Sequence, residues 1–137
     1  RLPRSIRRAW RARKVMITGI VQRREAVIPL TVLGSRRQRM EFDAVIDTGY
    51  TGWITLPPGI VSALGLRWYS LGRGILADGT ISIYDVYVAR IVWDGNIRKV
   101  RVNQLDAAPL IGMSLLRGFA LNMRVRYRGP VTLTKLS

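Results

Sequence analysis

From Ile17 onward, apolar residues form short runs separated by turn-forming residues, and this spacing constrains the fold more than any other feature of the chain. Short runs rich in Val, Ile, Thr and aromatic residues are typical of β-strands, while Gly-Ser and Asp-Gly pairs are typical of tight turns. Such pairs stand at Gly34-Ser35, Asp78-Gly79 and Asp94-Gly95. The pattern predicts extended segments at 17–22, 26–33, 40–46, 66–77, 80–93, 97–103, 119–127 and 131–136.

Two short helices fit between these segments. Pro57 and Pro58 are tolerated in a first helical turn and Gly65 can end a helix, so we expect one helix within 57–65. The other is expected at 113–117. Neither has the length of the crossover helix that joins parallel strands. The sequence therefore predicts a mostly β protein, built as a closed barrel or a sandwich.

The length and the charge distribution suggest one domain preceded by an arm. A chain of 137 residues can bury a real core but is too short for two lobes. The net charge is +15, and seven of the 23 basic residues lie before residue 15, where there is no acidic residue. We expect a basic, flexible arm at 1–15 and a single domain at 16–137. The arm is also compatible with a targeting segment or an artefact, and the lack of a secretory signal and of cysteine favours the cytoplasm.

The chain has neither cysteine nor histidine, which excludes several kinds of site. Disulfides, thiolate catalysis, sulfur-ligated metal sites and the nucleophile systems that need imidazole are ruled out. Acid–base chemistry would have to come from Lys, Tyr or the eight Asp and Glu residues. We expect no metal and no organic cofactor.

One of these acids stands directly after an apolar strand, in the sequence Asp47-Thr48-Gly49. The strand gives the acid a rigid support. Gly49 has no Cβ, so the backbone can turn sharply and its N–H can face the carboxylate, while the Thr48 hydroxyl can fix the loop by hydrogen bonding. Taken alone, an Asp before a glycine-containing loop is most often a turn residue.

A second motif and a turn accompany this segment. Leu110, Ile111 and Gly112 follow some sixty residues later and open the second short helix, and a hairpin turn, Ala77-Asp78-Gly79, lies between the two motifs. In spacing and residue type, 16–136 resembles the retropepsin-like aspartic proteases, and is most similar to their short cellular and bacterial single-domain members. The resemblance implies a closed β-barrel with a flap hairpin, one or two short helices and one lobe per chain.

The resemblance also implies a mechanism and a partner. Aspartic proteases hold a water molecule between two carboxylates, yet this chain has one Asp-Thr-Gly, so a homodimer with Asp47 from each copy is expected. Thr48 would hydrogen-bond across the dimer axis, Gly49 would bind substrate backbone, and Ala77, Asp78 and Gly79 would cover a peptide or protein substrate. The C-terminal strand at 131–136 is a candidate interface strand.

Two other functions fit parts of the sequence. The domain could be catalytically silent and serve dimerisation or binding, because fold does not guarantee chemistry. It could also be a basic β-barrel that binds nucleic acid, which the net charge favours and the lack of an aromatic–basic stacking motif disfavours.

Overall fold

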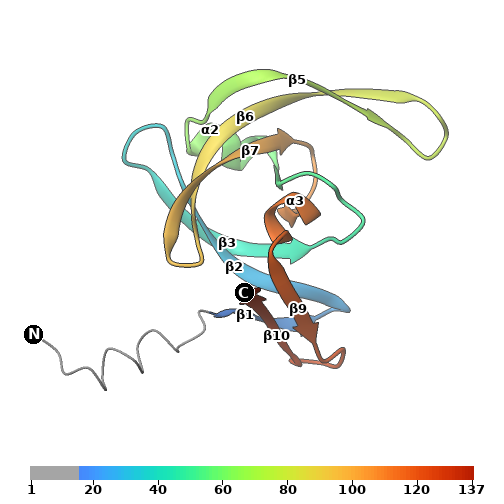
Figure 1. Cartoon of the computed structure of the whole chain (residues 1–137). Coiled ribbons are helices and arrows are strands. Elements are labelled where there is room, and N and C mark those ends of the chain that lie inside the picture. The colour runs from blue at the N-terminus through green and yellow to red at the C-terminus, as the bar shows by residue number, and fades with distance from the viewer. Residues whose placement is uncertain (1–15) are drawn as a thin grey trace, which may run out of the picture.

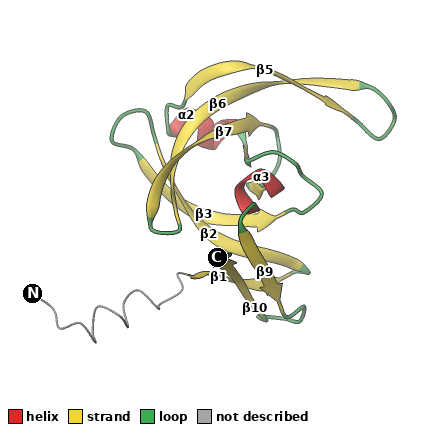
Figure 2. Ribbon diagram, viewed as in Figure 1, coloured by secondary structure: helices red, strands yellow, loops and turns green. Residues whose placement is uncertain are grey.

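The computed structural model describes residues 16–137, so the predicted arm at 1–15 lies outside the described residues. Strands dominate this part of the chain, with two short helices between them (Figure 2). In chain order the elements are β1 (Met16–Gln22), β2 (Glu25–Leu33), β3 (Arg39–Ile46), β4 (Ile54–Leu56), α2 (Pro58–Ala63), β5 (Arg67–Ile75), β6 (Ile81–Trp93), β7 (Asn96–Gln104), β8 (Leu110–Ile111), α3 (Met113–Leu116), β9 (Phe119–Met123) and β10 (Pro130–Lys135).

Six of the strands pair in a closed circuit. Their pairings run β2–β3–β8–β4–β7–β6 and return to β2, because β6 pairs with the end of β2 at Leu33↔Arg90 and Thr31↔Val92. Figure 1 shows the resulting curved arrangement, with the β5–β6 hairpin extending beyond it at the upper right. The predicted mostly β fold with one lobe is confirmed, and its pairings close as expected for a barrel.

Strands β1, β10 and β9 continue the sheet below this circuit in Figure 1. β10 pairs with β1 along one edge and with β9 along the other, for example at Leu133↔Ile17 and Leu133↔Leu121. The backbone of the C-terminal strand is therefore already paired on both sides. The predicted interface strand at 131–136 therefore cannot form an interface by pairing its backbone with a strand of a partner.

The core draws residues from the circuit, from both helices and from β1 and β10, and it follows the alternation of the strands. In β2 the side chains of Ile28, Leu30 and Val32 are fully buried, while Pro29 faces out. Strands β6 and β10 supply further buried residues, including Ile91 and Leu133. Alternate residues of a strand point to opposite faces, so the period of two in the sequence becomes one apolar face toward the core.

The first hairpin uses an unusual turn. Arg23 and Arg24 join β1 to β2 and both have positive φ angles, 51° and 62°. A two-residue turn of this kind matches the twist of paired strands but requires positive φ at both central positions, where Asn and Gly are preferred. The β6–β7 turn at Asp94 and Gly95, with φ of 53° and 75°, follows that preference and confirms the predicted Asp-Gly turn.

The structure corrects the predicted elements at three places. β4 and β8 were not predicted, because runs of three and two residues are too short to show a period. The predicted strand at 119–127 ends at Met123, since the next residues turn back, with Arg124 N–H bonded to the Pro130 carbonyl. The first helix lies within the predicted range 57–65, where Pro58 opens it and Gly65 follows it with φ of 56°.

Within residues 16–137, neither helix is long and apolar enough to cross a membrane.

Candidate functional site

Asp47 lies where strand β3 ends, and its carboxylate is held by the loop that it begins. The N–H of Gly49 donates a hydrogen bond of 2.9 Å to Asp47 Oδ1, and the N–H of Tyr50 donates to the Asp47 carbonyl at 3.1 Å. The side chain is half-buried, whereas Thr48 and Gly49 are exposed. The loop therefore turns sharply behind the acid, as the residues Asp47-Thr48-Gly49 predict.

The second motif lies directly beside this loop. β8 inserts between β3 and β4, parallel to β3 at Ile46↔Ile111 and antiparallel to β4 at Ile54↔Ile111. The N–H of Asp47 donates to the Ile111 carbonyl at 2.9 Å. Two motifs far apart in the sequence thus form one rigid unit around the acid.

Gly112 permits this close approach. Its N–H donates to the Trp53 carbonyl at 3.0 Å, and a Cβ at this position would collide with the Gly52 carbonyl oxygen and with the Tyr50 ring. Any larger residue would push the loop away from β8. The glycine of the second motif is therefore explained by packing rather than by chemistry.

Helix α3 also holds the loop by hydrogen bonds. The N–H groups of Met113 and Ser114 donate to the carbonyls of Tyr50 and Gly52 at 2.8 and 3.1 Å. The Ser114 hydroxyl donates to the Thr51 carbonyl at 2.6 Å. Unpaired N–H groups at the start of a helix need acceptors, and here the loop carbonyls supply them.

Tyr50 is a supporting residue that the sequence did not single out. Its hydroxyl donates to the Ile54 carbonyl at 3.1 Å and accepts a bond of 3.0 Å from the Asn103 side-chain amide. Burial raises the pKa of Tyr50 above its usual value of 10.0. An aromatic residue in a loop belongs to no alternating pattern of apolar residues. The inward position of Tyr50 is therefore visible only in the structure, where β7 lies beside the loop.

An apolar cleft of about 470 Å³ opens beside the exposed part of the loop. Thr48 and Thr51 line one side, and residues of α3 and β9 line the rest: Met113, Ser114, Leu116, Arg117, Gly118, Phe119 and Leu121. Met113 is about half-exposed within it. The cleft therefore joins the predicted active-site loop to an accessible apolar surface.

The predicted flap is the end of the β5–β6 hairpin. Its turn is closed by the Leu76 N–H, which donates to the Thr80 carbonyl at 2.8 Å, and Gly79 has a φ of 85°. Asp78 accepts bonds from the Thr80 hydroxyl and N–H at 2.6 and 2.9 Å, which lower the pKa of its carboxyl, the hydroxyl bond having the larger effect. In Figure 1 this tip projects on the side where β3 ends.

The hairpin has two unlike faces. Gly72 and Gly74 are covered by the Tyr84 ring, which a Cβ at Gly72 would strike. The opposite face carries exposed apolar side chains near the tip, namely Leu71, Ile75, Ile81 and Ile83. Exposed apolar surface on a two-stranded arm is typical of a segment that covers a ligand or a partner.

The fold is similar to that of a solved protein described as a retropepsin-like aspartic protease from Rickettsia conorii, with a TM-score of 0.58. The two sequences are 18% identical, and the match covers 90% of this chain and 92% of the other. The chain has a retropepsin-like fold. No protein-family model matches the sequence, and no curated protein was found to be similar to it.

Within this retropepsin-like fold, the predicted residues fall into two groups. Asp47, Thr48 and Gly49 contact or adjoin the second motif at Leu110, Ile111 and Gly112. Ala77, Asp78 and Gly79 lie at the hairpin tip, and the described residues show no hydrogen bond between that tip and the Asp47 loop. Among residues 16–137, no cluster of three acidic side chains could hold a metal ion.

Proposed function

We propose that the chain is an aspartic endopeptidase whose catalytic acid is Asp47. The observation that carries the proposal is the fixed, half-buried Asp47 carboxylate at the end of β3, held by the Gly49 N–H and tied through its own backbone to Ile111. Solvent reaches the adjoining loop residues, so a substrate can approach the acid. The similarity in fold to a solved aspartic protease supports the same activity.

Hydrolysis requires two carboxylates, and we propose that two copies of the chain supply them. One Asp47 carboxylate takes a proton from water as that water attacks the peptide carbonyl carbon, while the protonated partner donates a hydrogen bond to the carbonyl oxygen. The proton then passes to the leaving amine as the C–N bond breaks.

The cleft beside Thr48 supports a homodimer. A two-fold axis through paired Asp47 residues would place Thr48 of each copy near that axis, and Thr48 lines the same cleft as the exposed Met113 of α3. Covering this apolar cleft would remove it from water, which favours association. The Asp-Thr-Gly sequence occurs once in the chain, so a single copy would lack the second acid.

The β5–β6 hairpin would close over the substrate. Ala77, Asp78 and Gly79 form its tip, and glycine at a positive φ permits that tight turn. A peptide bound in extended form beneath the hairpin would exchange backbone hydrogen bonds as an added strand does. The exposed Leu71, Ile75, Ile81 and Ile83 would then contact apolar side chains of the substrate or of the second hairpin.

Peptide hydrolysis by the protein and two matched variants tests the proposal. Asp47→Asn removes the proposed acid, while Asp43→Asn makes the same change within β3, the strand before Asp47, at an exposed position opposite Pro29. A mixed peptide library incubated between about pH 3 and 8 spans the range in which such dyads work. We expect cleavage by the wild type and Asp43→Asn, and none by Asp47→Asn. Equal behaviour of all three folded proteins would favour a catalytically silent domain.

A further inference from the structure

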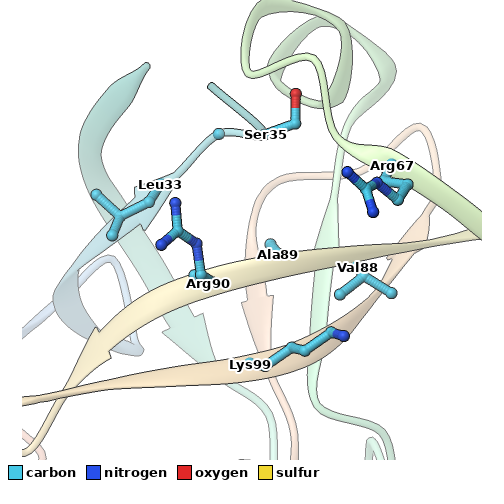
Figure 3. A pocket seen from close by; sticks show the side chains of 8 residues that line it. Leu33, Ser35, Arg67, Val88, Ala89, Arg90 and Lys99 are labelled. Carbon is cyan, nitrogen blue, oxygen red and sulfur yellow. The ribbon is translucent and has the colours of Figure 1, made fainter. Parts of the chain in front are cut away.

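A separate hollow of about 280 Å³ lies at the junction of β2, β5, β6 and β7 (Figure 3). Three cationic side chains line it, and no acidic one does: its residues are Leu33, Gly34, Ser35, Arg67, Val88, Ala89, Arg90 and Lys99. None of them belongs to the Asp47 loop or to the cleft beside α3. The hollow is therefore distinct from the proposed active site.

Strand register brings the three cations together on the outer face of the sheet. Arg90 lies opposite Lys99 on β7 and opposite Leu33 on β2, while Arg67 lies opposite Val88, two residues before Arg90. Positions two apart share a face, and diagonal neighbours are about 7–8 Å apart, within reach of long side chains. Figure 3 shows the Arg67 and Arg90 side chains on the same side of β6.

This arrangement is unfavourable for the free protein. Like charges directly opposite each other on paired strands repel, as Arg90 and Lys99 do. No carboxylate lines the hollow to offset the repulsion. An anion bound between the cations would offset it, and its binding would stabilise the folded chain.

The side chains indicate which anion fits. Each guanidinium presents a planar pair of donors that matches a phosphate or carboxylate group, while Lys99 adds a mobile positive charge. The Ser35 hydroxyl offers a further donor at the rim. The hollow is slightly smaller than the pockets that take drug-sized ligands, which are about 300–1,000 Å³.

We propose that this hollow binds a compact oxyanion with two or more negative charges, such as a diphosphate group or a small polycarboxylate. Arg67 and Arg90 hold its oxygens by paired hydrogen bonds, and Lys99 neutralises the remaining charge. The site does not depend on Asp47. Because the cations are exposed, the affinity falls as the salt concentration rises.

Isothermal titration of the full chain at low salt tests this proposal, with sodium pyrophosphate and sodium citrate as separate probes. The test variant is Arg67→Gln with Arg90→Gln. The control variant is Arg124→Gln with Arg126→Gln, which removes the same charge from exposed positions beyond β9. Lys99→Gln serves as a single substitution that leaves both arginines in place.

We expect the test variant to bind at least about tenfold more weakly than the wild type, because charge-assisted hydrogen bonds are lost. The control should change affinity less than about threefold, the smaller effect of a distant charge. Tighter binding of pyrophosphate than citrate would identify phosphate as the ligand group, and the reverse would identify carboxylate. Asp47→Asn should bind pyrophosphate and citrate with the affinity of the wild type, whatever the effect of this substitution on hydrolysis.

Two results would overturn the proposal. The first is an absence of binding of both probes to the wild type. The second is an equal loss of affinity in the test and control variants, which would mean attraction by net charge alone. In the first case, binding of a single-stranded oligonucleotide to the wild type, and equally to Lys99→Gln and the test variant, would favour a nucleic-acid surface elsewhere.

Discussion

The backbone N–H of Asp47 donates a hydrogen bond of 2.9 Å to the carbonyl oxygen of Ile111, so the proposed catalytic residue is anchored to the second motif through the main chain. Substitution of the Asp47 side chain leaves that bond in place. The variants used to test catalysis should therefore keep the loop geometry, and the effects on activity can be separated from effects on folding.

Gly112→Ala should destabilise the protein by about 1–3 kcal/mol, the usual cost of overpacking. The new methyl group would collide with the Gly52 carbonyl and the Tyr50 ring. Gly59→Ala is the matched control, because a Cβ there meets nothing within 4 Å and the position is helical. Urea unfolding measures both. Equal effects of the two substitutions would contradict the packing described for Gly112.

Tyr50→Phe should lower the free energy of unfolding by about 1–2 kcal/mol. The substitution keeps the ring and removes the hydroxyl that bonds to the Ile54 carbonyl and the Asn103 amide. Tyr127→Phe is the control, since Tyr127 is 82% exposed and lies in the turn before β10. A loss in the control as large as that in Tyr50→Phe would count against the hydrogen bonds assigned to Tyr50.

The same tyrosine should make stability depend on alkaline pH. Burial raises the pKa of Tyr50 in the folded chain above its usual value of 10.0, so the folded state holds this proton more tightly than the unfolded state. Its contribution is present below pH 10.0 and is lost as the pH rises from there through the raised folded pKa. Urea midpoints measured across that window should fall less in Tyr50→Phe than in the wild type. Parallel curves would contradict this assignment.

Arg24→Gly should stabilise the β1–β2 hairpin by about 0.5–1 kcal/mol. Arg24 has a φ of 62°, a conformation that costs a residue with a Cβ about 1–2 kcal/mol, partly offset by the greater freedom of glycine in the unfolded chain. Arg37→Gly removes the same charge at an exposed position without positive φ and should be neutral or destabilising. Thermal unfolding compares them, and a stabilisation shared by both would indicate charge rather than backbone conformation.

The strands with clear alternation could be predicted from the sequence, and so could the position of Asp47 at the end of one of them. Residues 26–33 carry buried side chains at every second position, 40–46 carry buried or partly buried ones, and Gly65 and Gly95 lie at the chain reversals expected of them. These features are local, because they depend on residues only a few positions apart.

The missed features depend on contacts between distant segments. β8 is a two-residue strand defined by its pairing with both β3 and β4, and Tyr50 gains its role only beside Asn103. The hollow at Arg67, Arg90 and Lys99 exists because register aligns three separate strands. No local pattern in the sequence predicts such contacts between distant segments.

Mixing of subunits tests the central claim most directly. Wild-type protein at a fixed concentration is combined with increasing amounts of Asp47→Asn, and the hydrolysis rate of a peptide that the wild type cleaves is measured. In a control series, Asp43→Asn is added in the same amounts. If the active site contains Asp47 from two copies, excess Asp47→Asn should capture wild-type subunits in inactive pairs, and activity should fall toward zero. Asp43→Asn should not reduce it. Unchanged activity in excess Asp47→Asn, with the variant shown to be dimeric by sedimentation, would contradict a shared pair of Asp47 residues.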